Sequence, residues 1–143
     1  MALTTDDMVQ IQQLYAKFSH AIDTGNTELF LSAFAPDGTF TRLGRTLRGH
    51  EELREMGSHG VAGRQRHFNT NILIDGDGDH ATGSSYLMLT RAVKQEPLIA
   101  TYTDTFVKLD GRWFIQSRDV KADERPMYEK YLQQQKDAGG TPA

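Results

Sequence analysis

The hydrophobic pattern of this chain changes its period once, and this change constrains the class of fold. Up to about residue 57 the apolar side chains recur every three or four positions, which is typical of helices that pack by one face. From about residue 65 they alternate, which is typical of strands with one buried face. Helices followed by strands predict an α+β domain in which N-terminal helices cover an antiparallel sheet.

The first helix is marked at both ends. Thr5 is the expected N-cap, two acidic residues follow it in the first turn, where they favour the helix dipole, and Gly25 is expected to end the helix. Six apolar residues between these ends lie in one stripe of the helical wheel: Met8, Ile11, Leu14, Tyr15, Phe18 and Ile22. This stripe is the surface expected to cover the sheet.

Two shorter helices are predicted next, over residues 27–35 and 50–57. Pro36 is expected to stop the first of them and to open a turn with Asp37 and Gly38. A short strand is expected to begin at Thr39.

Four strands are predicted in the second half, joined by short segments with turn residues, over residues 65–75, 79–93, 98–109 and 112–121. Such consecutive strands form an antiparallel meander. A curved sheet of this kind, covered by helices, tends to form a cone with a central apolar pocket, where ligands bind.

Length and composition favour one domain that buries a core without disulfide bonds. We expect this domain to span residues 1–126. Residues 127–143 are expected to carry a C-terminal helix over 127–135 and a disordered tail.

Charge and residue types exclude several classes of function. The net charge is −3 and the basic residues are scattered, so neither nucleic acid nor a membrane is an expected partner. The absence of cysteine excludes thiolate metal sites, and no other spacing matches a metal motif, so no metal and no cofactor is expected. The N-terminus lacks the pattern of a signal peptide and no long apolar run occurs, so a cytoplasmic location is expected.

His67 is the first candidate for chemistry. Alternation along its strand predicts His67, Asn69 and Asn71 on one face, with Phe68 and its alternating neighbours Thr70 and Ile72 on the other. The polar row faces either solvent or a polar-lined cavity.

Asp23 is the second candidate, because it lies beside the apolar stripe of the first helix, next to the small residues Ala16 and Ser19. It is either a polar residue at a helix end or a partner for an imidazole. A carboxylate bonded to His67 would hold one ring tautomer and leave the other nitrogen free to take a proton from a substrate. Elimination, hydration and isomerisation all need such a base.

Arg118 is the third candidate. Alternation places it on a face with Phe114 and Gln116, where it either holds an oxyanion or ligand carboxylate or pairs with Asp104 on the neighbouring strand. Residues expected to line the pocket and contact a substrate are Tyr15, Phe18, Phe40, Asn69, Tyr86, Tyr102 and Asp104.

The order and spacing of several short motifs resemble those of the SnoaL-like group of the nuclear transport factor 2-like superfamily, over roughly residues 5–121. These motifs are Ile11–Tyr15 with Asp23, Asp37–Phe40, Arg48–Gly49, His67–Asn71, Tyr102–Asp104, and Asp110–Trp113 with Arg118.

This resemblance implies a lyase or isomerase of the dehydratase, isomerase or cyclase type, acting on a small apolar molecule such as a steroid, polyketide or aromatic compound. In the dehydratase and dehydrochlorinase branch, Asp23 and His67 match the positions of a base dyad and Arg118 matches a strand arginine. That branch has a lysine or tyrosine five residues before the aspartate, where this chain has Phe18. Phenylalanine cannot donate a proton, so the general acid is Tyr15, Tyr86 or Tyr102, or is absent.

The alternative is a domain that only binds ligands or assembles, like the small subunit of ring-hydroxylating oxygenases. In either case the outer face of the sheet is expected to pair with another copy, as a dimer or trimer, through exposed apolar residues such as Leu87 and Leu89 or their neighbours.

Overall fold

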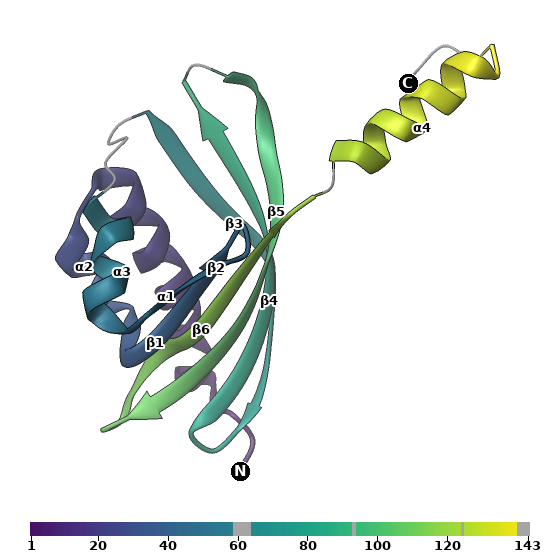
Figure 1. Cartoon of the computed structure of the whole chain (residues 1–143). Coiled ribbons are helices and arrows are strands. Elements are labelled where there is room, and N and C mark those ends of the chain that lie inside the picture. The colour runs from purple at the N-terminus through teal and green to yellow at the C-terminus, as the bar shows by residue number, and fades with distance from the viewer. Residues whose placement is uncertain (59–63, 93, 124, 140–143) are drawn as a thin grey trace.

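The computed structural model describes residues 1–58, 64–92, 94–123 and 125–139. Three N-terminal helices lie against one side of a curved, six-stranded sheet that does not close into a barrel (Figure 1). In chain order the elements are α1 (Thr5–Thr24), α2 (Thr27–Ser32), β1 (Phe34–Arg42), β2 (Arg45–Arg48), α3 (Gly49–Ser58), β3 (Gln65–Asp77), β4 (His80–Arg91), β5 (Lys94–Leu109), β6 (Arg112–Ala122) and α4 (Arg125–Asp137). The predicted α+β architecture is confirmed.

Helix α1 begins one residue earlier than predicted. Thr4, not Thr5, is the N-cap, and it forms a capping box with Asp7. Gly25 ends the helix in the left-handed conformation, with φ of 69°, as its position in the sequence predicts.

The four long strands β3–β6 form the predicted antiparallel meander. The whole sheet is nevertheless mixed, because β1 adds a parallel neighbour to β6. Its strand order is β2-β1-β6-β5-β4-β3, and β1 runs parallel to β6. The segment predicted as a turn at Pro36–Gly38 lies within β1, where the pairing with β6 is irregular between Phe34 and Thr39. Proline has no N–H to give to a ladder, so it is tolerated where the pairing is interrupted.

Strand β2 has no counterpart among the predicted strands. It pairs with β1 through a tight turn at Leu43 and Gly44, whose φ angles are 52° and 74°. Positive φ at both turn positions is typical of a two-residue hairpin. Because leucine rarely adopts this conformation, the sequence carries only a weak signal for the turn.

Two irregularities in strand pairing change which side chains face the helices. In β3 the register shifts between Thr70 and Leu73, and Asn71 has a positive φ of 53°. Ile72 therefore packs against the core, although alternation from His67 predicts the opposite face. This corrects the expected grouping of Asn71 with His67.

The second irregularity lies in β6. The register shifts where Thr105 and Phe106 of β5 pair with Ser117 and Ile115 of β6, so Gln116 is an extra residue. Arg118 therefore points inward like Ile115, and not with Phe114 and Gln116 as predicted.

The core between helices and sheet is centred on Phe18. Its ring lies 5.3–6.0 Å from the ring centres of four other aromatic residues: Phe30, Phe34, Phe40 and Tyr102. Phe18 itself is fully buried. The apolar stripe of α1 thus meets the inner face of the sheet, as predicted.

The outer face of the sheet carries exposed apolar side chains, and of the predicted alternatives these are the neighbours of Leu87 and Leu89. Leu87 is buried and Leu89 packs against the core, whereas Tyr86 and Met88 between them are 54% and 41% exposed. Met88 pairs with Phe68 on β3, which is also exposed.

The C-terminal helix α4 is longer than the predicted 127–135 and stands apart from the sheet and the other helices (Figure 1). Lys136 and Asp137, expected in the tail, belong to this helix. Ala138 and Gly139 form a turn after the helix, and residues 140–143 of the expected tail lie outside the described residues. None of the helices in the described ranges is both long enough and apolar enough to cross a membrane.

Candidate active site

Asp23 and His67 meet between α1 and β3. Nδ1 of His67 lies 2.6 Å from Oδ1 of Asp23, and the backbone N–H of His67 donates to Oδ2 at 2.9 Å. Both side chains are largely buried, with 9% and 8% exposure. A carboxylate can only accept, so Nδ1 carries the hydrogen, and the unprotonated Nε2 of a neutral ring has no protein partner among the described residues.

The same flank of α1 makes a second polar contact with β3. Ser19 lies one helical turn before Asp23, and its hydroxyl donates to the side-chain oxygen of Asn69 at 2.8 Å. His67 and Asn69 are two residues apart on β3, so two matched pairs hold the helix against the strand. His67 and Asn69 of the predicted polar row therefore face α1 rather than solvent.

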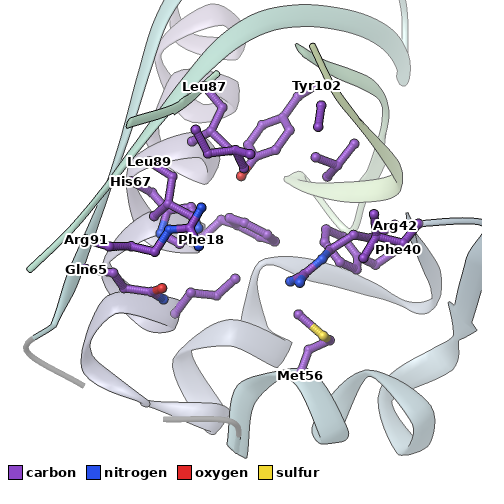
Figure 2. Close-up of a pocket in the computed structure, with 15 residues that line it drawn as sticks. Phe18, Phe40, Arg42, Met56, Gln65, His67, Leu87, Leu89, Arg91 and Tyr102 are labelled. Atoms are coloured by element: carbon purple, nitrogen blue, oxygen red, sulfur yellow. The ribbon is translucent and has the colours of Figure 1, made fainter. Parts of the chain in front are cut away.

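His67 also lines a cavity of about 420 Å³ between the helices and the sheet. Most of the lining is apolar and comes from both sides of the cavity: Phe18, Phe40, Leu87, Leu89, Tyr102 and Val120. The polar lining residues are Arg42, Gln65, His67 and Arg91 (Figure 2). A mainly apolar cavity with a few convergent polar groups is typical of a small-molecule site.

Tyr102 supplies a hydroxyl group to this cavity. Its ring is buried, and Figure 2 shows the hydroxyl pointing into the cavity. Burial raises the pKa of Tyr102 well above its usual range, although the nearby Arg118 opposes this shift. The phenol therefore stays protonated and available as a hydrogen-bond donor.

Arg118 does not line the cavity. Its guanidinium donates twice to Asp104, at 2.7 and 2.9 Å, with neither side chain exposed. It also lies over the rings of Tyr15, Phe18 and Tyr102, at 4.3–4.8 Å from the ring centres. Of the two alternatives predicted for Arg118, the structure shows the ion pair with Asp104. The guanidinium packs against the aromatic residues that line the cavity, on their side away from it.

The seven predicted contact residues fall into three groups. Phe18, Phe40 and Tyr102 line the cavity. Three residues lie between the helices and the sheet but do not line the cavity: Tyr15, Asn69 and Asp104. Tyr86 was expected in the pocket, but it is exposed on the outer face of the sheet. Its neighbours on β4, Ser85 and Leu87, are buried, so the side chain between them points to the opposite face.

Three polar lining residues were not predicted from the sequence. Gln65 and Arg91 could have been found from the register of β3 and β4, because they pair with each other two positions from the pair of His67 and Leu89. Arg42 could not be found in this way, because only a start at Thr39 was predicted for its strand and no partner strand was assigned to it. Among the described residues, no three His, Asp or Glu side chains gather in a way that could hold a metal ion.

Comparison with known families agrees with this architecture. The family model of the SnoaL-like domain matches residues 4–119. The chain belongs to the SnoaL-like family. No curated protein matches the sequence of this SnoaL-like chain.

Solved structures of similar fold include proteins without a known activity. A Nostoc punctiforme protein of unknown function with a cystatin-like fold is 30% identical, with a TM-score of 0.80 over 87% of this chain and 97% of that one. A variant of Rv3472 from Mycobacterium tuberculosis, also of unknown function, is 33% identical, with a TM-score of 0.79 over 85% of this chain and 79% of that one.

An enzyme shares the fold at lower identity. Hexachlorocyclohexane dehydrochlorinase LinA-type3 from Novosphingobium barchaimii is 20% identical, with a TM-score of 0.72 over 83% of this chain and 88% of that one. At this identity the similarity shows that the SnoaL-like fold is shared.

Proposed function

We propose that this SnoaL-like protein is a lyase or isomerase in which His67 removes a proton from a small, mainly apolar molecule. The observation that carries the proposal is the contact between Asp23 and His67 at the edge of an apolar cavity. The carboxylate holds one tautomer of the ring, so Nε2 is the nitrogen left to accept the proton. The dehydrochlorinase with the same fold supports a reaction of this general class.

The reaction begins when Nε2 of His67 takes a proton from carbon or from a hydroxyl group of the substrate. The imidazolium that forms is stabilised by the adjacent carboxylate of Asp23. Charge that develops on a substrate oxygen is stabilised by a hydrogen bond from Tyr102, whose hydroxyl points into the cavity (Figure 2). Asp23 is therefore a positioning residue, and His67 and Tyr102 are the catalytic residues.

Phe18 influences which reaction follows. It lines the cavity and cannot donate a proton to a leaving group. The raised pKa of Tyr102 makes its phenol a hydrogen-bond donor rather than a strong acid. These two features favour isomerisation, in which His67 returns its proton to another atom of the substrate, over elimination of a poor leaving group.

Proton exchange into a panel of small apolar molecules tests the proposal. Apolar ketones and cyclic alcohols are incubated with the protein in D₂O, and loss of C–H signals is followed by NMR. We expect exchange in at least one compound, slowed by about 10²–10⁴-fold in His67→Ala. The control is His20→Ala, which removes an exposed histidine of α1. Equal exchange by His67→Ala and the unchanged protein would refute the proposal.

We also propose that copies of this chain associate through the outer face of the sheet. Phe68, Met88 and Ile99 form a continuous cross-strand row and are each 41–52% exposed. Such a row favours burial against a second apolar surface. The assembly does not compete with catalysis, because the cavity lies on the inner face. We expect Met88→Lys to lower the mass measured by sedimentation, and an unchanged mass would contradict this interface.

A further inference from the structure

Two arginines line the cavity, and neither has an acidic partner in the part of the chain that the structure describes. Arg42 ends β1 and Arg91 ends β4, and Figure 2 shows both side chains reaching into the cavity from opposite sides. Within the described ranges, neither guanidinium makes a hydrogen bond or ion pair with a carboxylate. By contrast, Arg45 on the neighbouring strand β2 pairs with Glu55 at 2.8 Å.

The register of β3 and β4 places Arg91 close to the proposed base. Leu89 pairs with His67, and Arg91 pairs with Gln65, so Arg91 occupies the next inward position along the hairpin. Such diagonal neighbours are separated by about 7–8 Å, within reach of a long side chain. The Nε atom of Arg91 is buried and has no acceptor. A buried donor without an acceptor is unfavourable, so an acceptor from a ligand is favoured at this place.

The charges around the cavity are not balanced. Among the described residues, its lining contains two guanidinium groups and no carboxylate. Asp23, which contacts His67, is already engaged by that residue through both oxygens. The chain as a whole has a net charge of −3, so the cavity is locally positive in an acidic protein. Two like charges that share a cavity of low dielectric repel each other, and an anion bound there offsets this repulsion.

We propose that the substrate is an amphipathic anion, with an apolar body and one carboxylate or similar anionic oxygen group. The anionic group is held by Arg42 and Arg91, and the apolar body lies against Phe18, Leu87 and Leu89, beside His67. The arginines thereby select the substrate and orient it toward the base. The inference rests on the proposed function for the reaction itself, but the binding preference does not require turnover.

Two fluorescent probes test the inference by binding alone. 8-Anilinonaphthalene-1-sulfonate and N-phenyl-1-naphthylamine share an apolar body, and only the first carries an anionic group. We expect the full chain at low salt to bind the anion more tightly by roughly tenfold to a hundredfold. 1-Naphthylacetate is expected to displace the anionic probe at lower concentration than its neutral analogue 1-naphthylacetamide.

Variants locate the preference on the two arginines. Arg42→Met and Arg91→Met keep most of the apolar stem of the side chain. Each is expected to weaken the preference for the anionic probe over the neutral one. The double variant is expected to lose this preference and still to bind the neutral probe. Arg45→Met, outside the cavity, is the matched control and keeps the preference. Circular dichroism checks that each variant folds, and the single variants carry the test if the double variant does not.

The inference is overturned if the unchanged protein binds both probes equally, or if the arginine variants keep the preference for the anion. His67→Ala separates this inference from the proposed function. If His67→Ala loses turnover and keeps the preference for the anionic probe, both the proposed function and the anion site are supported. If His67→Ala keeps turnover while the arginine variants lose the preference, the proposed function fails and the anion site stands.

Discussion

The carboxylate of Asp104 holds the guanidinium of Arg118 by two hydrogen bonds inside the core, directly behind the aromatic lining of the cavity. Both side chains are inaccessible to solvent. The pair comes from neighbouring strands, β5 and β6, at directly paired positions. It therefore fixes the rings of Phe18 and Tyr102 from the sheet side, and neither residue of the pair lines the cavity itself.

Breaking this buried pair is expected to destabilise the fold strongly. Asp104→Asn leaves the guanidinium of Arg118 buried without a countercharge, and we expect the free energy of unfolding to fall by about 3–5 kcal/mol. Urea unfolding followed by circular dichroism measures the loss. The control, Glu55→Gln, weakens the exposed contact with Arg45 and is expected to lower the free energy of unfolding by about 0–1 kcal/mol. Similar losses in the two variants would argue against the structural role of the buried pair.

The hydroxyl of Tyr102 is expected to matter for turnover and little for folding. It points into the cavity and has no hydrogen-bond partner among the described residues (Figure 2). Tyr102→Phe is expected to lower kcat by about 10²–10³-fold, as for loss of one donor to a developing oxyanion. Tyr15→Phe removes a buried hydroxyl outside the lining and keeps turnover. Unchanged kcat in Tyr102→Phe would remove this residue from the mechanism.

Asp23 is expected to act through the orientation of His67. Asp23→Asn keeps the size of the side chain but removes its charge, so the preference for a hydrogen on Nδ1 weakens and turnover falls by about 10²–10⁴-fold. A purely structural role would not change the ring tautomer. ¹⁵N NMR of the imidazole reports the tautomer directly, and an unchanged spectrum together with lost activity would contradict this account.

The start of α1 is expected to make stability depend on pH in the acid range. A hydrogen bond from the indole of Trp113, with others from Lys108 and Thr4, holds the pKa of Asp7 well below its ordinary value of 3.8. Because the folded-state pKa is the lower one, the carboxylate stabilises the fold above about pH 4 and loses this effect as the pH falls.

Asp7→Asn is therefore expected to unfold at a lower urea concentration than the unchanged protein at pH 7. The gap between the two urea midpoints should narrow as the pH falls below the ordinary pKa of Asp7, 3.8. The matched control is Asp6→Asn, next to it on the exposed side of α1. A gap that stays constant down to pH 2 would show that the charge of Asp7 is not the cause.

Much of the fold follows from local patterns. The ends of α1 depend on caps and a glycine, and the four long strands depend on alternation and turn residues, all of which are local in the sequence. The positions of Asp23 and His67 were indicated by a family resemblance, because a helix end and a strand start keep their relative places within a fold.

The rest depended on partners far away in the chain. The irregularities at Asn71 and Gln116 reverse the faces of the residues that follow, and they exist only relative to the strands that pair with them, β4 and β5. This is why alternation placed Ile72 on the wrong face and grouped Arg118 with Phe114.

By itself, the sequence determined the class of fold, the order of the main elements and the residue types available for acid–base chemistry, because periodicity and capping act over a few residues. Only the tertiary structure decided that Arg118 is buried against Asp104 while Arg42 and Arg91 enter the cavity. The sequence alone does not distinguish an arginine that is buried in an ion pair from one that lines a cavity. Its role depends on strand register and on which carboxylate comes within reach, and both are set by long-range packing.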